Sequence, residues 1–126
     1  MLDKIYESLL NDDYIAEQAK GRIKYYEYPE TATMDKPHII IDPLDVPMPD
    51  DYADDTWLTD DYLYQIEVWS KSRSITEKLS ARIRHVLWGM GFKQGSGMDE
   101  WDKDFNIFRD ARRYRGKVYR DDFDSL

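Results

Sequence analysis

The sequence contains no cysteine and only two histidines, His38 and His85. The absence of cysteine excludes disulfides, thiolate metal sites and cysteine nucleophiles. No stretch is long and apolar enough to cross a membrane, and the opening residues MLDKIYESLLNDD lack both the basic start and the apolar run of a signal peptide. These absences predict a soluble protein that is made in the cytoplasm.

Lysine and arginine are absent between positions 37 and 70, a region that carries nine acidic residues. Eight of these acids are aspartates in the segment 42–61, which also holds three prolines. Between positions 105 and 120 the balance reverses, with six basic residues against one acid, Asp110. The net charge of −8 argues against a general nucleic-acid-binding protein, which is normally basic. The chain therefore carries two patches of opposite charge.

Length and composition predict one folded domain. The 126 residues are 41% hydrophobic and include ten tyrosines and four tryptophans, so a core without disulfides is feasible. We expect a single domain over residues 1–126, with residues 121–126 as a loose tail.

Apolar residues at helical spacing predict a helix at the start of the chain, over residues 2–10, followed by a continuation or a second short helix through residue 20. The clearest helix begins at Ser72 or Ser74, where Ser74 and Glu77 fit a capping box. Its apolar stripe consists of Ile75, Leu79, Ile83, Val86, Leu87 and Met90. This helix would cover a sheet.

The expected strands are 22–29, 39–41, 61–70 and a C-terminal hairpin formed by 98–101 and 105–119. The segment 42–61 is expected to be a long acidic loop, because its prolines exclude a helix or a central strand. The segment KQGSG, 93–97, reads as a flexible loop. Together these elements predict an α+β fold, in which a small antiparallel or mixed sheet is packed by an N-terminal helix and one long central helix.

The segment that starts at Asp102 resembles a calcium-binding loop in its first positions but departs from it later. Asp102, Asp104 and Asn106 occupy alternate positions, as in such a loop. However, Ile107 stands where the sharp turn requires glycine, and Arg113 stands where a bidentate glutamate is required. We therefore expect no calcium and no cofactor.

Two other functions remain as less favoured alternatives. Paired acids in 42–61 could form a carboxylate metal site of a hydrolase, although such sites usually add histidine. The basic strand could bind nucleic acid with Tyr114 and Tyr119 as stacking rings, against the repulsion of the nearby aspartates. No serine stands in a nucleophile elbow, since the only candidate, QGSG, lacks the required context. An enzyme is not expected.

Complementary patches on one domain favour a heterologous interface, in which the acids of one subunit meet the bases of the next and the contact closes a ring. Two alternatives stay open: both patches are solvated surfaces, or the acidic segment folds back on its own basic strand. Trp57 either anchors the segment to its own core or docks on a neighbour. The candidate interface or lumen residues are Asp50, Asp51, Asp54, Asp55, Trp57, Arg109, Arg112, Arg113 and Arg115.

The segments YYEYPE, IIIDPLDVP, DYADDTWLTDDYLYQIEVWSKS and FRDARRYRGKVYR resemble a family of small siphophage tail components from Gram-positive hosts. The resemblance covers residues 5 to 120, and DDTWLTDDYLYQIEVWSK and RDARRYRG are its specific parts. The order of elements is also similar to that of siphophage tail-completion proteins, which include tail terminators and head-to-tail joining proteins.

The resemblance implies a non-enzymatic virion protein of the tail or neck, assembled in the host cytoplasm. Six copies would form a ring at the head-proximal end of the tail tube, with the major tail tube protein and the head connector proteins as partners. A head–tail connector stopper or another minor tail or neck component is the alternative role. Genomic DNA would pass the lumen without specific binding, and an acidic lumen would not retain a polyanion. The acidic segment faces either that lumen or a neighbouring subunit.

Overall fold

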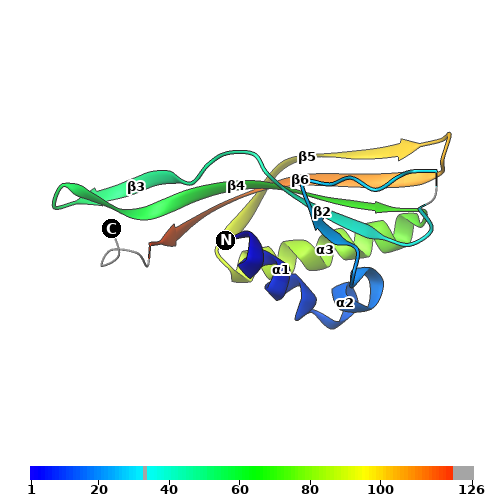
Figure 1. Ribbon diagram of the computed structural model, residues 1–126, viewed down its shortest axis with the longest axis horizontal. Helices are drawn as coiled ribbons and strands as arrows, with labels where there is room; N and C mark the ends of the chain where they lie inside the picture. The colour runs from blue at the N-terminus through cyan, green and yellow to red at the C-terminus, as the bar shows by residue number, and fades with distance from the viewer. Residues whose placement is uncertain (33, 121–126) are drawn as a thin grey trace.

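A computed structural model describes residues 1–32 and 34–120, which form three helices and a six-stranded sheet (Figure 1). The elements in chain order are α1 (Leu2–Leu10), α2 (Asp13–Ala19), β1 (Ile23–Tyr25), β2 (His38–Pro43), β3 (Met48–Ala53), β4 (Thr56–Ser70), α3 (Arg73–Gly89), β5 (Phe92–Asp102) and β6 (Ile107–Tyr119). This confirms the predicted α+β class. The C-terminal segment 121–126, predicted to be loose, lies outside the described residues.

The sheet is mixed and has the order β1-β2-β4-β6-β5, with β3 paired to the first part of β4. Only the β1–β2 pair is parallel. All three helices lie on the same side of the sheet (Figure 1). β3 and β5 leave free strands at opposite edges of the sheet, because β4 and β6 separate them.

The main core lies between the helices and the sheet. The strand predicted over 61–70 lies within β4, and its Tyr64, Ile66 and Val68 are buried beneath the helices. α3 contributes Leu79, Ile83 and Leu87 to the same core. Of the two predicted starts, Ser72 and Ser74, the structure confirms Ser72, whose hydroxyl accepts the hydrogen bond from the N–H of Ile75. The prediction of a Ser74–Glu77 box was wrong.

The acidic segment 42–61 is not a long loop. Met48–Ala53 forms β3 and pairs with Thr56–Asp61 of β4, so that Asp54 and Asp55 alone make the turn. Both turn residues have positive φ, +50° and +63°, which is the requirement of a type I′ hairpin turn and a conformation that aspartate tolerates. Pro49 is accommodated because β3 is an edge strand, Pro43 is the last residue of β2, and Pro47 lies between the two strands.

The segment 93–97, predicted to be a flexible loop, is also in a strand. It belongs to β5, and the register between β5 and β6 shifts between Gln94 and Gly97, which marks a β-bulge. Glycine is required at the end of the bulge, since a Cβ on Gly97 would lie 2.4 Å from the carbonyl oxygen of Ala111. Gly97 therefore permits a close approach of β5 to β6, in a segment that is paired as a strand.

Asp12 joins α2 to α3. Its Oδ1 accepts a hydrogen bond of 3.0 Å from the N–H of Ile15 as the N-cap of α2, and its Oδ2 accepts one of 2.9 Å from Nε of Arg82. Burial would raise the pKa of Asp12, but the hydrogen bonds from Arg82 and Ile15 lower it below its ordinary value. One carboxylate thus fixes the position of two helices.

Replacing this carboxylate gives a first prediction. Asp12→Ala removes the cap and the partner of Arg82, and we expect it to lower the free energy of unfolding by about 1–2 kcal/mol for the cap, with a smaller addition for the half-exposed arginine. Asp12→Asn keeps the cap oxygen and should retain most of this stability. Urea denaturation measures both. An Asn variant as unstable as the Ala variant would show that the ion pair, not the cap, dominates.

Candidate assembly surface

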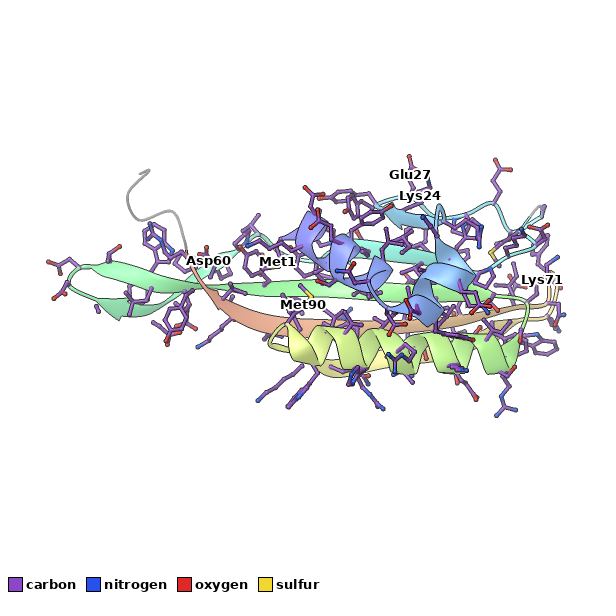
Figure 2. The ribbon with its side chains drawn as sticks, turned by 90° about the horizontal axis from the view of Figure 1, so that it is seen from below. Met1, Lys24, Glu27, Asp60, Lys71 and Met90 are labelled. Atoms are coloured by element: carbon purple, nitrogen blue, oxygen red, sulfur yellow. The ribbon has the colours of Figure 1, made fainter. Side chains whose placement is uncertain are left out.

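The β3–β4 hairpin projects beyond the helices as an arm (Figure 1). Figure 2 shows Asp60 at the base of this arm, farther along the long axis than Met1 and Met90, which flank the near ends of α1 and α3. We use "acidic arm" for residues 48–61. Three of its predicted interface residues, Asp51, Asp54 and Asp55, are exposed, and Asp50 is half-buried.

Two cations of β6 pair with acids at the base of the acidic arm. Nζ of Lys117 lies 2.9 Å from a carboxylate oxygen of Asp50 and 3.4 Å from one of Asp51. The hydrogen bond from Lys117 lowers the pKa of Asp50. In the same way, Arg115 lies 3.0 Å from Asp61. For these residues the structure shows the intramolecular pairing that the sequence left as one alternative.

The tip of the acidic arm differs from its base. Within the part of the chain that the structure describes, Asp54 and Asp55 make no ion pair, and the Tyr52 side chain beside them is 71% exposed. Trp57 is half-buried on the strand opposite Tyr52. Its ring lies under the guanidinium of Arg120, 3.8 Å from the ring centroid, and its Nε1 donates to Asp60. These contacts attach Trp57 to its own molecule.

Two of the four predicted arginines on β6 serve the interior of the chain. Arg109 donates a hydrogen bond of 2.7 Å to the buried Glu67 and stacks on Trp69, 4.6 Å from the ring centroid. Arg112 binds Asp110 through two hydrogen bonds, of 2.8 and 3.0 Å, and also donates to Gln94. Burial would lower the pKa of Arg112, but Asp110 raises it.

The other two predicted arginines lie on the open face of the sheet, the face opposite the helices. Arg113 and Arg115 are exposed and line a hollow of about 440 Å³ together with Leu63 and Lys93. Arg115 is paired with Asp61, whereas Arg113 and Lys93 make no ion pair among the described residues. The sequence identified Arg113 and Arg115 but missed Lys93, because its segment was assigned to a flexible loop.

A second surface was also missed. Trp88 on the outer side of α3 is 64% exposed, and with Arg84 and His85 it lines another hollow of about 440 Å³. The signal in the sequence is a tryptophan outside the apolar stripe of an amphipathic helix, four residues after an arginine.

Among residues 1–32 and 34–120, no group of three or more histidine, aspartate or glutamate side chains could hold a metal ion. No helix in the described ranges combines the length and hydropathy needed to cross a bilayer. The hollows are open, shallow and lined by arginine, lysine and tryptophan, which suits contact with another macromolecule.

Comparison with known proteins gives a match of fold. A chain in the solved structure of the virion of a native gene transfer agent particle aligns over 92% of this chain and 92% of its own length, with a TM-score of 0.63 and 13% sequence identity. No family model and no curated protein sequence matches the chain. At this identity the comparison shows a shared fold.

Proposed function

We propose that this chain is a structural protein of a phage-like particle. The observation that carries the proposal is the likeness to a virion chain, which extends over nearly the whole of both chains. The open, charged hollows and the projecting acidic arm fit a role in assembly and offer no enclosed substrate site. The role that we propose is therefore a structural one, and it rests on this likeness.

Within that class we propose a tail-completion subunit, a tail terminator or head-to-tail joining protein. Six copies form a ring at the head-proximal end of the tail tube, where the major tail tube protein and the head connector proteins are its neighbours and genomic DNA passes through the lumen. The resemblance of the segments DDTWLTDDYLYQIEVWSK and RDARRYRG to siphophage tail components supports this role. A connector stopper is the second candidate, and affinity capture with the separate tube and connector proteins distinguishes the two.

The subunit contact that we propose is heterologous, because acids and bases lie at different places on one molecule. The predicted residues available for it are those that make no ion pair among the described residues: Asp54 and Asp55 on the acidic arm, and Arg113 on β6. Arg115, two residues further along β6, is already paired with Asp61. Asp50, Asp51, Arg109 and Arg112 support these residues from within the subunit.

Light scattering at low and high salt tests the ring. We expect a species of about 91 kDa, six times the 15.1 kDa of the chain, that dissociates as salt screens the contact between charges. A hexamer that persists in high salt would keep the ring and assign its stability to apolar contacts. A strict monomer at high concentration would contradict self-assembly and leave assembly on the tail tube as the mechanism.

A further inference from the structure

Three hollows run as a continuous surface around the start of the edge strand β5. The hollow on α3 holds Arg84 and Trp88, and a second hollow places these two residues beside Lys93. The third hollow, on the open face of the sheet, joins Lys93 to Arg113. We use "basic band" for Arg84, Trp88, Lys93 and Arg113. The band extends from the helical face to the open face and exceeds the patch on β6 that the sequence predicted.

The basic band has unsatisfied charge. Arg84, Lys93 and Arg113 make no ion pair in the described ranges, whereas the neighbouring Arg82 and Arg115 are paired with Asp12 and Asp61. Trp88 lies among these cations with most of its ring exposed. An aromatic ring surrounded by unpaired cations suits a ligand that carries carboxylates next to an apolar or aromatic group.

The tip of the acidic arm has this composition. Asp54 and Asp55 are unpaired in the part of the chain that the structure describes, and Tyr52 is the most exposed aromatic residue of the acidic arm. The arm tip lies beyond the helices along the long axis (Figure 1), so that it is presented to other molecules. The arm tip combines carboxylates with an aromatic ring, and the basic band combines cations with an aromatic ring. The arm tip of one copy is therefore complementary to the basic band of another copy.

We propose that the tip of the acidic arm of one copy docks on the basic band of the next copy, with Tyr52 against Trp88 and with Asp54 and Asp55 facing Arg84 and Lys93. This inference rests on the proposed function only in taking a second copy as the partner. It adds α3 and β5 to the subunit interface. A heterologous contact of this kind propagates from copy to copy until a ring closes.

Two variants test the docking. The arm variant carries Asp54→Asn and Asp55→Asn, because asparagine removes the charges and tolerates the positive φ of the turn. The band variant carries Arg84→Ala and Trp88→Ala. All four positions are exposed, so the fold is expected to survive. Each variant alone should remain a monomer. An equimolar mixture should give a 1:1 dimer of about 30 kDa, twice the mass of the chain, because one intact arm meets one intact band and no further contact is possible. Light scattering after gel filtration measures these masses.

A matched control carries Trp101→Ala and Lys103→Ala, which remove one exposed tryptophan and one exposed cation at the β5–β6 turn. The control should assemble as the wild type does. If the wild type and the band variant both form hexamers, the proposed contact between arm tip and basic band is wrong, but the proposed hexameric ring is not contradicted. Absence of the 1:1 dimer from the mixture also overturns the docking. Retention of DNA by the wild type that the band variant loses, without that dimer, would make the basic band a nucleic-acid surface instead.

Discussion

Glu67→Ala is expected to lower the free energy of unfolding by about 3–5 kcal/mol, the usual cost of removing one partner of a buried ion pair. Glu67 is 0% exposed on the open face of the sheet. One of its oxygens accepts hydrogen bonds from Arg109, at 2.7 Å, and from the Trp69 indole, at 3.1 Å. The other oxygen accepts from Gln65 at 3.1 Å. Without Glu67 these donors, drawn from β4 and β6, lose their common acceptor.

This cluster also organises the segment between β1 and β2. Tyr28 from that segment packs on Trp69, with 5.6 Å between ring centroids. Met34 joins Ile40, Trp69 and Ile107 in a second, smaller core on the open face. Trp69 both donates to Glu67 and packs in this second core, so loss of Glu67 should also loosen the packing of the segment between β1 and β2 on the sheet. Hydrogen exchange at the amides of 39–41 and 66–69 would detect such loosening.

The pH dependence of the same contact has a definite sign. Burial would raise the pKa of Glu67, but the hydrogen bonds from Arg109, Trp69 and Gln65 lower it below its ordinary value of 4.5. A carboxylate with a lowered pKa in the folded state stabilises the fold above the unfolded value, and this stabilisation is lost as the pH falls through the folded value. The difference in unfolding free energy between wild type and Glu67→Gln should therefore be constant near neutral pH and shrink below about pH 4.5.

Glu77→Gln is the matched control, since Glu77 is exposed and forms only an i,i+4 pair with Arg73. Its effect should stay below about 0.5 kcal/mol. Denaturation of each variant across the acid range gives all of these values. If Glu67→Ala were as mild as the control, the cluster would not hold the open face together.

The elements with strong periodicity could be predicted from the sequence, and the arm could not. The core face of β4 and the stripe of α3 follow from spacing alone, because burial on one side fixes which residues are apolar. The acidic arm lacks this signal, since few of its side chains are buried and its turn, Asp54–Asp55, contains no glycine. The pairing of β3 with β4 depends on backbone hydrogen bonds and on neutralisation by Lys117, which lies 66 residues away from Asp51 in sequence.

The sequence predicted which segments carry the charges of the candidate site, but not which of those charges are paired within the chain. Charge asymmetry pointed to 42–61 and 105–120, but it did not separate cations that serve the interior from those that stay free. Alternation on β6 turns Arg112 and Asp110 to the helical face, and turns Arg109, Arg113 and Arg115 to the open face. On the open face the separation depends on the acids of β4, since Glu67 binds Arg109 and Asp61 binds Arg115, whereas Arg113 lies opposite Gln65. Lys93 and Trp88 come near Arg113 because β5 pairs with β6 at the edge of the sheet and also contacts α3.

Gly116→Val is expected to destabilise the fold by about 3 kcal/mol, the upper end of the range for overpacking a core. Gly116 on β6 lies opposite Phe92 on β5, and the ring of Phe92 occupies the space where a side chain would stand. A Cβ at this position would lie 2.7 Å from Cγ and Cδ1 of Phe92. The ring cannot retreat easily, because Phe92 is 1% exposed and contacts Tyr62 and Tyr64.

Gly95→Ala in β5 is the control, since the nearest atom to a Cβ there is the carbonyl oxygen of Arg113 at 3.7 Å, an ordinary contact. Its effect should stay within about 0.5 kcal/mol.

A double-mutant cycle identifies the cause. Phe92→Ala alone should cost about 3–5 kcal/mol by leaving a cavity, and Gly116→Val combined with Phe92→Ala should cost less than the sum by about 0.5–3 kcal/mol, because valine fills part of the space that the ring leaves. Unfolding free energies from urea denaturation close the cycle. Strict additivity would mean that the ring and the glycine do not share this space. Coupling of the expected sign would show that the ring of Phe92 over Gly116 holds β5 on β6. The same contact sets the position of Lys93, which follows Phe92 in sequence and belongs to the basic band.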